Sequence, residues 1–175
     1  LVLAAGPQAK ANTVGDLVAA AKASPGTINY ASTGNGTALH VAGELFKSAA
    51  GINVQHVPYR GGGQAVTALL AGEVAYIIGN TQLVMPQVSG GKVKALAVTG
   101  DRRLAALPDV PTFAQAGTPG VDVVTWFGLF APKGVPAPVK ARIEKAVSTV
   151  MAKPEVKARL AKLDLLAIDD WLLAP

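Results

Sequence analysis

Short β-type runs alternate with helical runs along most of this chain, and this alternation limits its fold more than any other feature. The strand-like runs are residues 1–5, 27–31, 53–57, 74–78 and 94–98. The helical runs are residues 14–23, 37–50, 64–70 and 82–88. Glycine, proline and small polar residues separate the two kinds of run. Such short connections predict βαβ units, a mainly parallel sheet and helices on both faces of it.

The pattern changes after the last of these runs. A proline-rich stretch leads into an apolar segment, residues 121–131, which is expected to be extended. Two helices are predicted after it, over residues 136–151 and 154–163, and each has a proline near its first turn. Residues 163–175 are unusually apolar for a chain end.

Composition excludes several classes of function. The chain has no cysteine, so it has no disulfide, no cysteine-bound zinc and no thiol nucleophile. Its net charge of +5 comes from residues 140–162. The basic residues there are spaced as on the solvated face of an amphipathic helix. Without aromatic side chains between these cations, nucleic-acid binding is not expected. No apolar run reaches the roughly 18 residues of a membrane helix.

Three glycine-rich turns follow strand-like runs and lead into helical runs, at residues 32–37, 59–63 and 79–81. Ligands of open α/β sheets bind outside the carboxyl ends of the strands, where these turns are expected to lie. The sequence therefore predicts a ligand site at this edge of the sheet.

The turn at residues 32–37 is the most informative of the three. Unpaired backbone N–H groups and the helix dipole attract anions at a helix start. Gly34 and Gly36 let a ligand approach the backbone, and the hydroxyls of Ser32, Thr33 and Thr37 add polar contacts. Because no basic side chain lies in the turn, it suits a carboxylate that binds reversibly. The alternative is a plain connection with a helix N-cap.

Other side chains near these turns have two interpretations each. Tyr59 offers an aromatic wall, while Arg60 either meets a ligand carboxylate or is solvated. His40 either faces the ligand or bonds a neighbouring backbone group, and His56 is expected to pack in its strand.

Catalysis is not expected. No serine has the context of a nucleophile elbow, no histidine pair has metal spacing, and no carboxylate pair flanks a glycine-rich turn. We therefore expect neither an enzyme nor a bound cofactor or metal, although a small enzyme that uses His40 stays a third hypothesis.

Four segments together resemble the Bug/TctC family, the extracytoplasmic solute receptors of tripartite tricarboxylate transporters. The first runs from Tyr30 to Phe46 and includes the Ser-Thr-Gly-Asn-Gly-Thr turn, His40 and Ala42-Gly43-Glu44-Leu45-Phe46. The other three are His56–Gly62, Lys94–Thr99 with Leu107–Thr112, and Trp126–Pro132.

The resemblance implies a type II periplasmic-binding-protein-like α/β fold, in which two domains close around a small carboxylate. Residues 1–6 would be a crossover strand between the domains, and residues 7–125 the ligand-binding second domain. Residues 126–175 would be the return crossover and the C-terminal helices of the first domain. That first domain is expected to be incomplete in this chain.

The expected function is that of a periplasmic solute-binding protein, or a fragment of one, which binds a small carboxylate or dicarboxylate for uptake by membrane transporter subunits. The alternative is a truncated homologue without transport, which self-associates as a homodimer through its exposed C-terminal helices. The predicted ligand-binding residues are Ser32, Thr33, Gly34, Asn35, Gly36, Thr37, His40, Tyr59, Gly61, Asn80 and Thr81.

Overall fold

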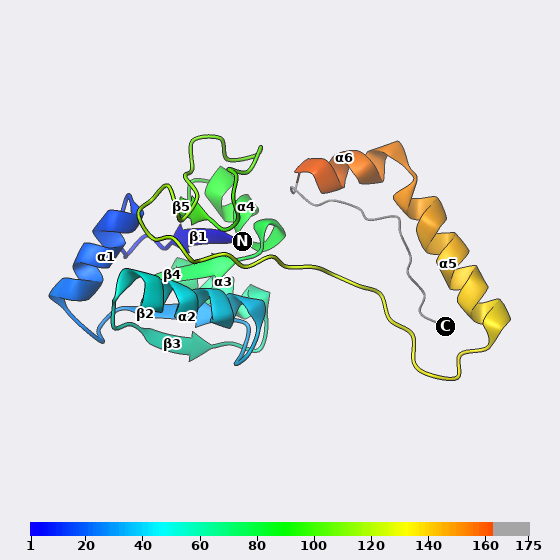
Figure 1. Cartoon of the computed structure of the whole chain (residues 1–175), viewed down its shortest axis with the longest axis horizontal. Helices are drawn as coiled ribbons and strands as arrows, with labels where there is room; N and C mark the ends of the chain where they lie inside the picture. The colour runs from blue at the N-terminus through cyan, green and yellow to red at the C-terminus, as the bar shows by residue number, and fades with distance from the viewer. Residues whose placement is uncertain (163–175) are drawn as a thin grey trace. The chain divides into compact units, whose positions relative to one another are not determined.

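The computed structural model describes residues 1–162 of the chain, which divides into two compact units, Leu1–Thr125 and Trp126–Pro175 (Figure 1). The strands are β1 (Val2–Ala5), β2 (Asn29–Ser32), β3 (Gln55–Pro58), β4 (Tyr76–Gly79) and β5 (Lys94–Val98). The helices are α1 (Val14–Ala23), α2 (Ala38–Ala50), α3 (Gly62–Ala71), α4 (Thr81–Ser89), α5 (Ala137–Met151) and α6 (Pro154–Lys162).

Every predicted helix and the five short strands are found in the predicted order, within a few residues of their expected ends. The apolar segment 121–131 differs, because it forms no regular strand. A strand needs a neighbour for its backbone hydrogen bonds, and no strand in residues 1–162 pairs with this segment. The expectations for residues 163–175, including a helix end at 163, lie outside the described residues.

The first unit contains one sheet with the strand order β3-β2-β4-β1-β5. β2 pairs in parallel with both β3 and β4, whereas β1 pairs antiparallel with β4 and β5. Four strands therefore point one way and β1 points the other, so the sheet is mainly parallel with one reversed strand. β1 and β4 are buried along their whole length, as central strands covered on both faces are.

Helices cover both faces of this sheet. Figure 1 shows α2 on the near side of the sheet and α3 behind it. One core cluster joins α1 and α2 to the sheet through residues such as Leu17, Phe46 and Tyr76. The other joins α3 and α4 to the opposite face through residues such as Leu69, Val84 and Ile77.

The first helix shows how locally its ends are determined. Thr13 Oγ1 accepts a hydrogen bond from the Asp16 amide, and the Asp16 carboxylate accepts one from the Thr13 amide. This reciprocal capping box places the start of α1 at Val14, the first residue of the predicted helical run.

The contact between α2 and β2 is unusually close. A Cβ atom built on Gly43 of α2 would lie 2.2 Å from Cε2 of Tyr30, which is fully buried. Only a glycine fits there, so α2 rests its backbone directly on the Tyr30 ring.

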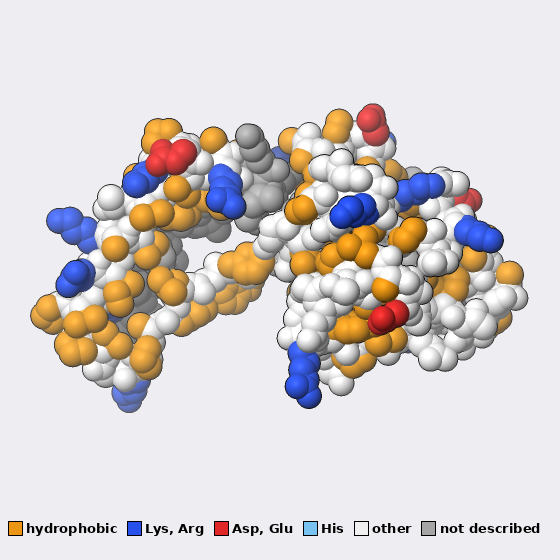
Figure 2. Space-filling view, turned by 180° about the vertical axis from the view of Figure 1, so that it is seen from behind, with side chains coloured by type: hydrophobic (Ala, Val, Ile, Leu, Met, Phe, Trp, Pro, Cys, Tyr) orange, Lys and Arg blue, Asp and Glu red, His pale blue; other side chains and the backbone are white. Residues whose placement is uncertain are grey.

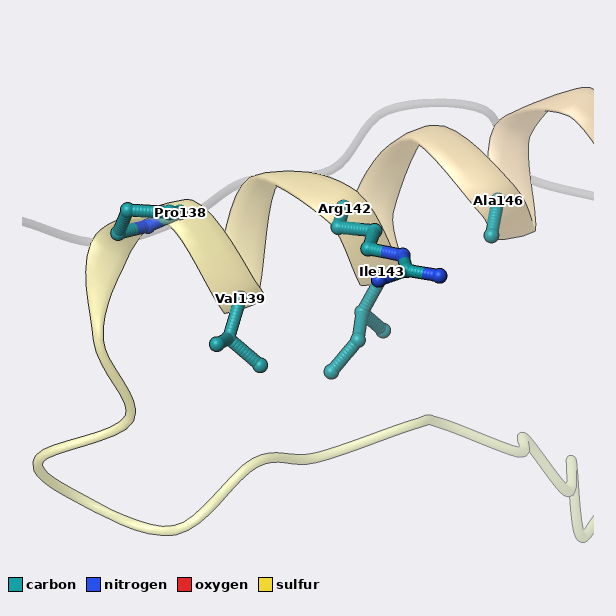
Figure 3. Close-up of a pocket in the computed structure, with 5 residues that line it drawn as sticks. All are labelled: Pro138, Val139, Arg142, Ile143 and Ala146. Atoms are coloured by element: carbon teal, nitrogen blue, oxygen red, sulfur yellow. The ribbon is translucent and has the colours of Figure 1, made fainter.

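In the second unit, α5 has no buried residue. Val139 and Ile143 are 47% and 41% exposed and point to the same side of the helix (Figure 3). Together with Pro138, Arg142 and Ala146 they line an open hollow of about 520 Å³. Figure 2 also shows hydrophobic side chains on the surface of this unit.

The Gly43 contact leads to a stability prediction. We expect Gly43→Ala to lower the free energy of unfolding by about 1–3 kcal/mol, because the added methyl group overpacks the contact with Tyr30. Gly63→Ala is the matched control, since Gly63 is also helical and a Cβ there meets nothing within 4 Å. The control should be neutral or slightly stabilising. Urea denaturation of both variants tests this, and equal effects would contradict it.

Candidate functional site

The carboxyl ends of β2, β3 and β4 lie at one edge of the sheet, and each strand is followed by a helix that begins there. α2 begins at Ala38, α3 at Gly62 and α4 at Thr81. Each helix start carries a partial positive charge and N–H groups without helical partners. Three such starts at one edge make it favourable for an anion.

The β2–α2 loop (residues 32–37) is fixed by hydrogen bonds of its own side chains. Ser32 Oγ accepts from the Gly34 amide at 3.0 Å, and Thr37 Oγ1 donates to the Gly34 carbonyl at 2.8 Å. Gly34 and Gly36 have φ of +126° and +76°, a region in which side chains are strained. The loop therefore needs both glycines to hold this shape.

Some backbone donors of the loop remain open. Within residues 1–162, no hydrogen-bond partner is found for the N–H groups of Asn35, Ala38 and Leu39. The Gly36 N–H, in contrast, donates to Nδ1 of His40 at 3.0 Å. His40 therefore bonds a neighbouring backbone group, which is one of the two arrangements that the sequence left open.

The second histidine holds the start of the loop. His56 Nε2 lies 2.6 Å from Ser32 Oγ, so β3 anchors the last residue of β2. The His40 ring stacks on the His56 ring with centroids 4.1 Å apart. His56 thus does more than pack in its strand, because it links both halves of the β2–α2 loop.

The stack continues across the sheet. Tyr30 lies opposite both His56 and Tyr76 in the strand register, and its ring stacks on theirs at 5.0 and 5.4 Å. His40, His56, Tyr30 and Tyr76 therefore form one row of rings, which we call the ring row.

Charged groups beside the ring row are paired. The Tyr30 hydroxyl donates to Glu44 Oε1 at 2.8 Å, and Lys47 Nζ lies 2.9 Å from Glu44 Oε2. Burial alone would raise the pKa of Glu44, but the hydrogen bonds from Lys47 and Tyr30 outweigh it and lower the pKa. Burial, followed by the neighbouring His40, lowers the pKa of His56. Both effects favour the neutral form of His56.

The remaining predicted residues lie at the same edge, with one exception. Gly61 precedes α3, Asn80 precedes α4, and Thr81 is the first residue of α4. The Asn80 Oδ1 atom is buried and has no hydrogen-bond partner in the described part of the chain. The side chain of Tyr59 instead packs against the α3–α4 face, where burial and the nearby Glu73 raise its pKa.

Sequence reasoning missed Tyr30 and Glu44 and gave His56 too small a role. A usable signal exists, since Tyr30 stands two residues before the end of β2 and His56 two residues before the end of β3. In parallel strands that end together, such residues lie side by side on the same face.

No group of three or more His, Cys, Asp or Glu in the described chain could hold a metal ion. None of the helices within residues 1–162 is long and apolar enough to cross a membrane. Two hollows of the first unit, of about 510 and 260 Å³, are lined by residues outside the β2–α2 loop.

The chain matches the family model described as "Tripartite tricarboxylate transporter family receptor" over residues 1–170. It is 40% identical over 150 residues to the UPF0065 protein in the tcbD-tcbE intergenic region of Pseudomonas sp. strain P51. That match covers 85% of this chain and 45% of the relative. The chain thus spans about half the length of the curated relatives it matches.

Solved structures resemble this one closely. R. palustris Rpa4515 with adipate has a TM-score of 0.86 and 28% identity, over 93% of this chain and 54% of its own. MatC (Rpa3494) from Rhodopseudomonas palustris with bound malate has a TM-score of 0.84 and 32% identity, over 93% and 55%. The expected periplasmic-binding-protein fold is therefore confirmed.

The lowered pKa of His56 predicts how stability depends on pH. Histidine in an unfolded chain titrates near pH 6.5, so below that pH the unfolded state binds this proton more readily than the folded state. The contribution of His56 to stability is complete above pH 6.5 and is lost as the pH falls. His56→Phe keeps a ring but cannot titrate, so its unfolding free energy should fall less between pH 7.5 and 5.5. Equal slopes in urea denaturation would contradict this prediction.

Proposed function

The chain belongs to the family of tripartite tricarboxylate transporter receptors, and on this basis we propose that it is the carboxylate-binding part of a periplasmic solute-binding protein. The observation that carries the proposal is the meeting of three helix starts and open N–H groups at one sheet edge. The relatives with adipate and with malate support a dicarboxylate as the ligand. The similar protein BugD is a periplasmic binding protein, which supports a periplasmic location. Because the family is described as receptors of a tripartite transporter, membrane transporter subunits are the proposed partners of the whole protein.

One carboxylate would be held by the β2–α2 loop. The open N–H groups of Asn35, Ala38 and Leu39 are donors, and the dipole of α2 adds favourable charge. No lysine or arginine lies in this loop, so the hydrogen bonds would be to neutral groups and binding would be reversible.

The start of α4 supplies a second set of polar groups. The amide oxygen of Asn80 is buried and has no partner among the described residues, and a half-turn of that amide places its NH₂ group where the oxygen lies. Together with Thr81 it would meet another oxygen of the ligand. A dicarboxylate therefore matches the two separate groups of donors better than a single carboxylate does.

The same geometry favours binding over catalysis. A serine and a histidine 2.6 Å apart are also the parts of an activated nucleophile. Ser32, however, is fully buried, and its Oγ already accepts a hydrogen bond from the Gly34 amide. A substrate carbonyl has no access to that oxygen, so the pair serves to hold the loop.

Removing one backbone donor tests the proposed site. Ala38 is the first residue of α2, where proline is well tolerated, and Thr37 before it has the extended φ and ψ that proline requires. We expect Ala38→Pro to weaken malate binding about tenfold, as the loss of one hydrogen bond to a charged group does. Isothermal titration calorimetry measures this effect, with urea denaturation as the check on stability.

Ala137→Pro is the matched control, because Ala137 is the first residue of α5, in the second unit. It should leave malate binding unchanged. Equal effects of the two variants, or no saturable binding of malate or adipate by the unchanged chain, would refute the proposed site.

Self-association is a second candidate function, favoured by the exposed apolar stripe of α5. Val139, Ile143 and Val150 of this stripe are 47%, 41% and 48% exposed. Exposed stripes of this kind promote pairing of like surfaces. We expect a dimer by light scattering at micromolar concentration and a monomer for Ile143→Lys. Ser148→Lys adds the same charge to the same helix at a polar position and should remain dimeric. A monomeric unchanged chain would rule this out.

A further inference from the structure

His40 accepts a hydrogen bond from the backbone of the β2–α2 loop. Its Nδ1 atom receives the Gly36 N–H at 3.0 Å. A ring nitrogen accepts only while it carries no proton, so this contact assigns the neutral ring with its hydrogen on Nε2. In this state the Gly36 N–H is not available to a ligand.

Protonation of His40 would turn this hydrogen bond into an unfavourable contact between two donors. Both nitrogens of a histidinium ion are donors, so a protonated Nδ1 and the Gly36 N–H would face each other as two donors. The bond must then open, which frees the Gly36 N–H beside the open N–H groups of Asn35 and Ala38. The same proton adds a positive charge to an edge that otherwise relies on helix dipoles.

We propose that His40 is a proton-operated gate on the Gly36 N–H, so that proton uptake by His40 and carboxylate binding by the β2–α2 loop strengthen each other. This rests on the proposed function. Linkage makes the effect reciprocal: a bound anion favours the protonated ring by the same factor by which the proton favours the anion.

The groups around His40 decide which histidine takes the proton. His56 of β3 stacks on the His40 ring, Tyr30 of β2 stacks on His56, and Tyr76 of β4 follows Tyr30. Two rings stacked at 4.1 Å do not both accept a charge readily. His56 Nε2 is bonded to the buried Ser32 Oγ, and burial lowers the pKa of His56, so a proton is disfavoured on His56.

Glu44 and Lys47, both on α2 with His40, are the other charged groups that face the pair. These two side chains form an ion pair with each other, with Lys47 Nζ 2.9 Å from Glu44 Oε2.

The rest of the loop keeps its shape when the gate opens. Gly34 donates to Ser32 Oγ, and Ser32 Oγ is bonded to His56 Nε2. This anchor does not involve His40. Opening the Gly36 contact thus exposes one donor without unfolding the loop.

Nuclear magnetic resonance of the full chain without ligand tests the gate directly. Between pH 8 and pH 5, where histidine changes its charge, the Gly36 amide signal should titrate with the same midpoint as the His40 ring. The Gly34 amide should not follow that midpoint. At pH 8 the His40 ring nitrogens should show hydrogen on Nε2. A Gly36 signal that ignores the His40 titration would overturn the proposal.

Two variants show which histidine causes the titration of the Gly36 amide. His40→Gln is neutral at every pH, so the Gly36 titration should vanish. His56→Gln cannot titrate but keeps a side chain that can hydrogen-bond Ser32 Oγ, so the Gly36 titration should persist. The reverse pattern would assign the gate to His56 and refute a role for His40.

Calorimetry with malate tests the coupling. The affinity of the unchanged chain should rise about fivefold from pH 8 to pH 6, a common size for linked sites. That of His40→Gln should stay constant. Binding that is independent of pH in the unchanged chain would refute the coupling alone. No binding at either pH would refute both the coupling and the proposed carboxylate site.

Discussion

The contact of α2 with the Tyr30 ring determines the position of α2 and of the β2–α2 loop at the carboxyl edge. Because Gly43 has no side chain, α2 lies directly against that ring. The residue that follows it, Glu44, then reaches the Tyr30 hydroxyl, and His40, one turn earlier, stacks on His56. The start of α2 and the loop before it are thereby held at a fixed distance from the sheet. The proposed site depends on that distance.

Local signals explain which parts of the fold were predictable. α1 begins where predicted because Thr13 and Asp16, neighbours in sequence, cap its N-terminus. The loop at residues 32–37 was predicted because glycines follow a strand-like run and precede a helical one. The direction of β1 was not predictable, because a short run of apolar residues looks the same in either direction. It depends on pairing with β4 and β5, which lie far along the chain.

The same distinction holds for the site. Alternation along a strand gives the face on which a side chain lies, but not the partner that it meets there. The ring row depends on the register of β2 with β3 and β4, so the bond between His56 and Ser32 could not be found from spacing alone. Spacing also does not give the direction of the Tyr59 side chain: its backbone N–H donates to the Ser32 carbonyl at the edge, while its side chain packs against the α3–α4 face.

The reversed strand also has a consequence for how the chain folds. Val2 of β1 pairs with Gly79 of β4 and with Val98 of β5, so the centre of the sheet joins segments that are far apart in sequence. Closing such long loops precedes any gain from the contacts, and a topology of this kind folds slowly. Until β1 inserts between them, β4 and β5 each present an unpaired apolar strand edge. In that interval the chain is most exposed to aggregation and to recognition by chaperones.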